Sequence, residues 1–170
     1  MLNKTRAVVL KTTNYSESSL VAQLYTEHFG MQSYLIAGAR KPKGKIKANI
    51  LQPLHLLEIV ATHKDNGSLQ RISEARQAPA LQEIPYDIVK SSLALFLNEI
   101  LYKILKEQEH DSYLFEFIHQ SILWLDQSHS NLANFHLVFL IKLTRFLGFY
   151  PAKSKQVLPL FQSSRSNLFK

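Results

Sequence analysis

The chain has 170 residues, 46% of them hydrophobic, and a formal net charge of +7 without a single cysteine. That apolar content can bury a core and excludes global disorder, while the lack of cysteine excludes a disulfide framework and a thiolate metal site. No stretch reaches the roughly 20 apolar residues that span a bilayer, and the first apolar run is too short for a signal peptide. We therefore expect a cytoplasmic protein with no membrane association, no metal and no cofactor.

The positive charge is unevenly distributed. Residues 1–80 hold 11 Lys/Arg against 5 Asp/Glu, whereas residues 81–170 hold 9 against 8. Clustered cations are the electrostatic footprint of a nucleic-acid surface. The first half of the chain is therefore the better candidate for such a surface.

Alternating apolar residues predict short strands throughout the first eighty residues. Gly30 separates the second strand from the third, Asn66-Gly67 is a strong hairpin signal, and Pro53 predicts a bend near the start of the fourth strand. Five strands joined by turns favour a small Greek-key barrel of the OB type. The expected strands cover residues 6–13, 20–26, 32–38, 50–62 and 69–76.

After Pro79 and Pro85 the apolar period changes from two to about 3.6, which predicts helices. The expected helices cover residues 86–107, a segment entered at Asp111 or Ser112, and a segment entered at Asn131 that stops at Gly148 and Pro151.

These patterns predict an α+β fold class in three parts. We expect a five-stranded OB-fold barrel for nucleic acid over residues 1–80, an α-helical domain over 81–151, and an irregular tail over 152–170.

The segment 38–47, called the basic loop from here on, lies between the third and fourth expected strands. It contains no acidic residue, and Gly38, Pro42 and Gly44 prevent it from forming a helix or a long strand. Such a segment is either a solvated connection or a phosphate-binding loop, and its charge density favours phosphate. Its cations are Arg40, Lys41, Lys43, Lys45 and Lys47.

In an OB barrel a nucleic-acid strand usually crosses strands two and three, held by the loops after strands one and four. The first of these loops offers Tyr15, the best base-stacking candidate, and the second offers Lys64 and Asn66. Tyr25 and Tyr34 lie between them and serve equally well as stacking platforms or as barrel packing. The basic loop follows strand three and so lies off this usual face.

Lys142 and Arg145 lie near the end of the third helix, beside Phe139 and Phe146. The favoured interpretation is that these cations complement the negative end of the helix dipole. The alternative is a basic and aromatic pocket for an acidic, hydrophobic peptide end.

The sequence contains no nucleophile elbow, phosphate-binding loop motif or zinc-protease motif. We therefore do not expect an enzyme, and no catalytic residue is predicted.

Several short motifs follow one another in a fixed order, ending with two in the helical half. They are Arg6-Ala7-Val8-Val9-Leu10-Lys11-Thr12, Tyr15-Ser16-Glu17-Ser18, Thr26-Glu27, Phe29-Gly30, Gly38-Ala39-Arg40-Lys41-Pro42-Lys43, Leu51-Gln52-Pro53, Lys142-Leu143 and Leu147-Gly148-Phe149-Tyr150-Pro151. Over about residues 4–151 this series resembles the bacterial RecO family of DNA repair proteins.

The resemblance implies an OB-fold joined to a helical domain, acting as a recombination mediator. Such proteins bind single- and double-stranded DNA, anneal complementary strands, join RecR, work beside RecF, and engage the C-terminal tail of single-stranded DNA-binding protein so that RecA can load. The implied tail site lies in the helical domain, which favours Lys142 and Arg145. The implied DNA contacts are Arg40, Lys41 and Lys43, supported by Lys11 and Lys45.

Two features depart from the family pattern. Many members carry a four-cysteine zinc site, and this chain has no cysteine. The helical domain is also expected to be incomplete relative to the family. Two other functions stay open: a protein-interaction scaffold whose basic loop docks an acidic partner, and an RNA-binding OB module.

Overall fold

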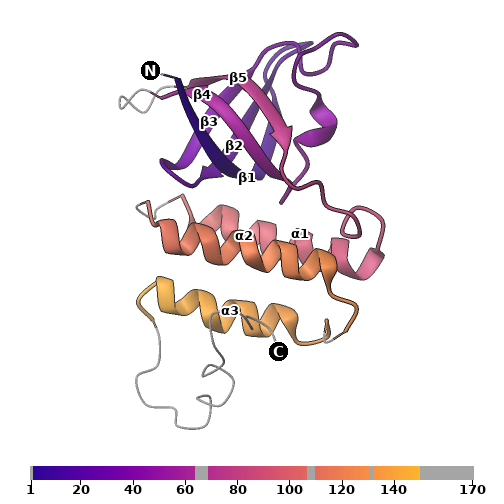
Figure 1. Ribbon diagram of the computed structural model, residues 1–170, viewed down its shortest axis with the longest axis vertical. Helices are drawn as coiled ribbons and strands as arrows, with labels where there is room; N and C mark the ends of the chain where they lie inside the picture. The colour runs from indigo at the N-terminus through magenta and orange to yellow at the C-terminus, as the bar shows by residue number, and fades with distance from the viewer. Residues whose placement is uncertain (1, 64–68, 107–109, 131, 150–170) are drawn as a thin grey trace.

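The computed structural model describes residues 2–63, 69–106, 110–130 and 132–149. A closed five-stranded barrel is followed by three helices, which confirms the predicted fold class. Figure 1 shows three layers: the barrel, then α1 and α2 side by side, then α3. Among the described helices, none has the length and apolar character needed to cross a membrane.

The barrel has the strand order β1-β2-β3-β5-β4, closed by pairing of β4 with β1. Neighbouring strands are antiparallel except β3 and β5, which run parallel and share only two residue pairs, Tyr34 with Gln70 and Leu35 with Arg71. The β3–β5 seam is therefore the weakest part of the wall. The strands are β1 (Leu2–Asn14), β2 (Leu20–Thr26), β3 (Gly30–Ile36), β4 (Leu56–Thr62) and β5 (Gln70–Gln77).

The expectation that the fourth strand begins at residue 50 is wrong. Ala48–Ile50 forms a short 3₁₀ helix, and Leu54 adopts a positive φ of 60° before β4 begins at Leu56. The turn is fastened to β1, because the Leu54 N–H donates to the Val9 carbonyl at 2.7 Å. The bend expected at Pro53 is a tight turn over residues 52–55, in which the His55 N–H donates to the Gln52 carbonyl, and β4 begins after it.

The alternation of side chains along β1 sends consecutive residues into two different cores. Ala7 and Val9 lie inside the barrel, while Val8 and Leu10 face the helices. Leu10 has no partner in the β1–β2 register, and its carbonyl instead accepts a hydrogen bond from the Asn98 side chain of α1 at 2.9 Å. Satisfying that carbonyl locks α1 to the barrel wall.

Two of the predicted cap positions are seen, at the start of α2 and after the end of α3. Asp111 is the N-cap of α2, as expected, and accepts from the backbone N–H groups of the first turn. α3 ends as predicted at Gly148, whose φ of 75° permits a closing turn in which Phe149 N–H donates to the Thr144 carbonyl. The expected cap Asn131 lies outside the described residues. The helices are α1 (Ile88–Ile104), α2 (Ser112–Gln127) and α3 (Phe135–Phe146).

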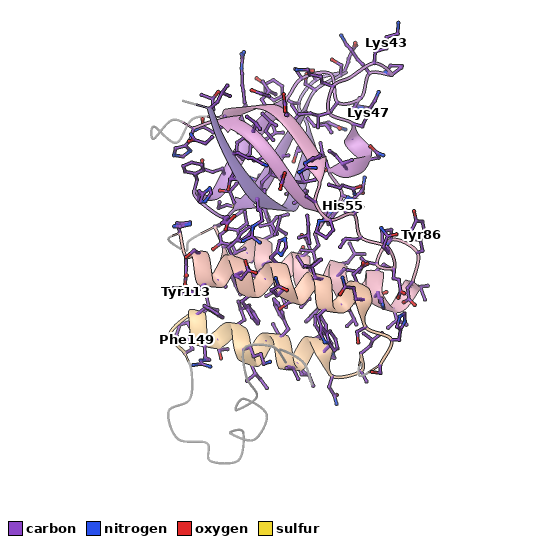
Figure 2. All side chains as sticks on the ribbon, viewed as in Figure 1. Lys43, Lys47, His55, Tyr86, Tyr113 and Phe149 are labelled. Carbon is purple, nitrogen blue, oxygen red and sulfur yellow. The ribbon has the colours of Figure 1, made fainter. Side chains whose placement is uncertain are left out.

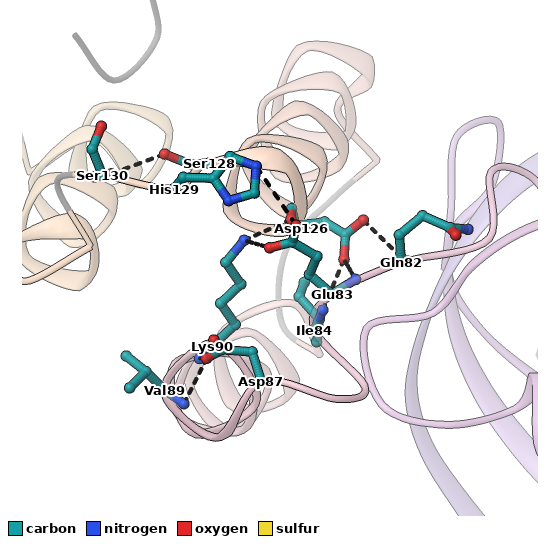
Figure 3. A network of polar contacts seen from close by, with 10 residues as sticks. All are labelled: Gln82, Glu83, Ile84, Asp87, Val89, Lys90, Asp126, Ser128, His129 and Ser130. Atoms are coloured by element: carbon teal, nitrogen blue, oxygen red, sulfur yellow. Dashed lines mark hydrogen bonds and ion pairs between the residues drawn. The ribbon is translucent and has the colours of Figure 1, made fainter.

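A buried polar network joins the entry of α1 to the end of α2 (Figure 3). The Asp126 carboxylate accepts from three consecutive backbone N–H groups, those of residues 82–84, at 2.8–2.9 Å. The ammonium of Lys90, only 2% exposed, donates to the Asp126 carbonyl at 2.7 Å and pairs with Glu83. Lys90 and Asp126 have partners and are shielded from water, while Glu83 is partly exposed, so the buried pair of residues holds the helices in place.

Candidate nucleic-acid interface

The basic loop is a braced structure built on two successive tight turns. Lys41 N–H donates to the Gly38 carbonyl and Gly44 N–H donates to the Lys41 carbonyl, both at 3.0 Å. Gly38 has a φ of 70°, and a Cβ added to Gly44 would lie 2.1 Å from the Gly38 oxygen. Both glycines are therefore required by geometry.

Two apolar residues anchor the loop to the barrel. Ala39 and Ile46 are 3% and 5% exposed and belong to the core inside the barrel. The Ala48 N–H donates to the Ala39 carbonyl at 3.1 Å, which ties the two ends of the loop together. Four of the five cations lie between these anchors and Lys47 follows them directly, and each of the five is exposed.

None of the described acidic residues pairs with a cation of the basic loop. Within the described residues, no ion pair involves any of the five cations, and the Lys47 ammonium donates instead to the Lys41 and Pro42 carbonyls. Figure 2 shows Lys43 and Lys47 projecting from the barrel, with Lys43 at the end opposite the helices. An uncompensated cluster of this kind attracts polyanions such as a phosphate backbone.

The structure brings the Tyr15 loop next to the basic loop. The Arg40 N–H donates to the Ser18 carbonyl at 3.2 Å, and a turn between Tyr15 and Ser19 closes the shorter loop. The Tyr15 ring is 63% exposed, so it is available for stacking. Its role in binding stays a prediction.

Lys11 lies elsewhere, at the junction between barrel and helices. Its ammonium sits over the Tyr102 ring of α1 at 5.0 Å, and Lys106 approaches the same ring at 4.1 Å. These cations lower the pKa of Tyr102, chiefly through a hydrogen bond from Lys106. Lys11 therefore belongs to a second cationic group rather than to the basic loop.

The two strand tyrosines considered as stacking platforms are both buried. Tyr25 and Tyr34 are 0% and 1% exposed, and burial raises the pKa of each to about 12. Both rings pack the cores, so the packing interpretation is the correct one. Lys64 and Asn66 lie outside the described residues.

The four residues considered for a peptide pocket differ in their exposure. Phe139 is 1% exposed and stacks on Phe117 at 5.1 Å, and Phe146 stacks on the same ring at 5.2 Å. Lys142 is half-buried, which lowers its pKa, whereas Arg145 is exposed. Phe139 belongs to the core and Phe146 packs against it, and a role of these four residues in binding a peptide stays a prediction.

Sequence reasoning missed one residue near the basic loop. Arg71 of β5 lies beside Lys45 at a pocket of about 260 Å³ that opens along the β3–β5 seam. The two residues are 26 positions apart in the chain. Only barrel closure brings Arg71 and Lys45 to the same pocket, so no local sequence pattern could have revealed that Arg71 lies there.

The fold and this surface define an OB-barrel protein with a cationic loop, carried on a helical base. Comparison with known families gives the narrower assignment. Residues 1–79 match the family described as "Recombination protein O N terminal", and residues 85–163 match "Recombination protein O C terminal".

Proteins named "DNA repair protein RecO" are similar along most of the chain. The Bacteroides fragilis protein is 44% identical over 151 residues, which cover 89% of this chain and 62% of that protein. The Flavobacterium psychrophilum protein is 38% identical, covering 94% and 67%, and the Azobacteroides pseudotrichonymphae protein is 37% identical, covering 99% and 70%.

The chain belongs to the RecO family. It spans 62% of the length of the Bacteroides fragilis relative. The helical part described above includes three helices, and the matched C-terminal region continues to residue 163.

Proposed function

We propose that this protein is a recombination mediator in DNA repair that binds single- and double-stranded DNA and anneals complementary strands. The observation that carries the proposal is the basic loop: five exposed cations, braced by backbone hydrogen bonds, with no carboxylate partner among the described residues. Membership of the RecO family makes DNA the favoured polyanion.

Annealing by this surface requires no bond-making chemistry. Two DNA strands repel each other through their phosphates, and cations that bind both backbones lower that repulsion. Base pairing between the strands then supplies the test of sequence. The protein therefore acts as an electrostatic mediator, and no side chain is assigned a catalytic role.

The partners proposed for this protein follow the family. We propose that it joins RecR and engages the C-terminal tail of single-stranded DNA-binding protein, so that RecA loads on coated DNA. Family membership supports this assignment. For the tail, Lys142 and Arg145 stay the candidate contacts in the helical part.

The test compares the parent protein with Arg40→Ala/Lys41→Ala/Lys43→Ala in DNA binding and annealing across a salt series. If the parent neutralises four or five phosphates, log K against log salt has a slope of about −3 on single-stranded DNA. The triple variant should lose most of this slope and most of its annealing rate. A matched control removes three exposed cations elsewhere, Lys4→Ala/Arg76→Ala/Lys103→Ala, for the same change in net charge.

Each outcome decides between functions. If the triple variant binds and anneals as well as the parent, the basic loop is not the DNA site. A parent protein that binds RecR but has no affinity for DNA would favour the scaffold function. Tighter binding of RNA than of DNA with the same sequence would favour an RNA-binding OB module.

A further inference from the structure

The β3–β5 seam opens into a pocket beside the basic loop. The two strands share their last pair at Leu35 and Arg71. The pocket has a volume of about 260 Å³ and takes its lining from three segments: β3, the end of the basic loop, and β5. This volume is slightly below the roughly 300 Å³ at which pockets for small molecules begin, so it suits one flat ring system.

The lining combines an apolar wall with two cations. Leu35, Ile46 and Ile72 supply the apolar surface, while Lys45 and Arg71 supply positive charge. None of the residues that line the pocket is acidic, and no described carboxylate pairs with Arg71. The complementary ligand is therefore a flat, largely apolar group attached to an anion.

A backbone irregularity shapes the rim of this pocket. In the β4–β5 register Ile72 pairs with Ala61 and Glu74 pairs with Val60, which leaves Ser73 without a partner. Such a bulge redirects the strand and re-aims the side chains around it. The exposed Ser73 thus stands at the mouth of the pocket with a small side chain that leaves the entrance open.

We propose that this pocket receives one unpaired base of single-stranded DNA while Lys45 and Arg71 bind the phosphates that flank it. The inference rests on the proposed function, because it assumes that DNA lies on the basic loop. The pocket would allow the protein to distinguish single-stranded from duplex DNA. A base in a duplex is stacked and paired, and extruding it costs free energy, so duplex DNA uses the loop without filling the pocket.

The first test closes the pocket without changing charge. Ser73→Trp should weaken binding of single-stranded DNA on the order of tenfold, the worth of one well-packed base, and leave duplex affinity within about twofold. Arg71→Gln should also weaken binding of single-stranded DNA more than binding of duplex DNA, by a smaller factor than Ser73→Trp. Ser92→Trp on the exposed side of α1 controls for a new surface tryptophan, and melting temperatures check folding of each variant.

The second test removes the bases and keeps the phosphates. An oligonucleotide of abasic residues should bind the parent more weakly than the same length of thymidine, and this difference should shrink in Ser73→Trp. Equal affinity of the parent for the two oligonucleotides would overturn the proposed base pocket. Equal losses of affinity for single-stranded and duplex DNA in both pocket variants would overturn it as well. If the parent binds no DNA at all, the proposed function itself fails, and that result is distinguishable.

Discussion

The basic loop and the network around Asp126 contain charged residues used in opposite ways. In the loop, five cations are exposed and pair with no described carboxylate. In the network, Lys90 and Asp126 are 2% and 4% exposed, and hydrogen bonds to backbone groups satisfy both. Charge that is buried and paired holds the fold, whereas charge left exposed on a rigid frame is available to a ligand.

This contrast implies that substitutions in the two regions separate cleanly. Changes in the network should reduce the free energy of unfolding and leave the intrinsic DNA affinity of the folded protein almost unaltered. Changes to the cations of the loop should do the reverse. A variant of either charged group that shifts both quantities together would break the comparison.

The largest effect is expected from Asp126→Ala. Removing this carboxylate leaves three backbone N–H groups without their acceptor, next to the buried ammonium of Lys90. We expect the free energy of unfolding to fall by about 3–5 kcal/mol, measured by urea denaturation. Asp87→Ala is the matched control, because Asp87 also accepts from backbone N–H groups but at an exposed helix start, where the loss is about 1 kcal/mol. Equal losses in the two variants would contradict this interpretation of burial.

A smaller and pH-dependent effect is expected at Glu27. Arg6 donates two hydrogen bonds to its carboxylate, at 2.7 and 2.9 Å, and this pairing lowers the pKa of Glu27. Because the folded-state pKa lies below the unfolded one, the pair stabilises the protein above the unfolded pKa, and the effect disappears as the pH falls through the folded pKa.

Glu27→Gln should therefore reduce the free energy of unfolding by about 1 kcal/mol at pH 7, a modest value because the pair is partly open to solvent. Measured at successively lower pH, the parent and variant curves should converge below about pH 4. A difference that stays constant down to pH 2 would show that Arg6 does not act through the charge of Glu27.

Gly44→Ala tests whether the frame of the loop matters as well as its charge. The added methyl would collide with the Gly38 carbonyl oxygen, a backbone atom, so the two turns must move apart, at a cost of more than about 1 kcal/mol. DNA affinity should fall although no cation has been removed, and the melting temperature should fall with it. Ala48→Gly at the foot of the loop, a change of similar size without a collision, provides the comparison. Unchanged affinity in Gly44→Ala would show that the cations act as a mobile cluster.

The smallest effect is expected from Lys43→Ala, at the tip shown in Figure 2. One phosphate contact fewer should reduce the magnitude of the salt slope on single-stranded DNA by about 0.7 and leave the free energy of unfolding unchanged. A reduction as large as that of the triple variant would mean that Lys43 alone holds the backbone.

The sequence carried enough local information to predict the barrel and its order of strands and helices. The β2 bounds match the expected 20–26, and Asp111 and Gly148 act as the predicted caps. The start of β4 was not predictable by alternation, because Leu51 and Leu54 are buried by a turn that precedes the strand. Period alone does not distinguish these two origins of burial.

The candidate site was predictable only where it is local. The basic loop is contiguous, so its charge is visible in the sequence. The burial of Lys90, the separation of Lys11 from the loop, and the approach of Arg71 to Lys45 all depend on tertiary packing between distant segments. A lysine in an amphipathic helix is expected at the surface, and only the partners supplied by Glu83 and Asp126 make its burial possible.

The position of β1 between two cores also affects how the molecule folds. Because β1 supplies both the barrel interior and the face that the helices cover, neither part can open without exposing apolar residues of the other. We expect one cooperative unfolding transition in place of two. A fragment ending near residue 80 would expose the apolar surface that the helices cover in the intact chain. This surface is formed by Val8, Leu10, Tyr25, Leu54 and Leu56. Self-association of the fragment through that apolar surface would mask the DNA affinity of the barrel. DNA affinity should therefore be measured on the intact chain.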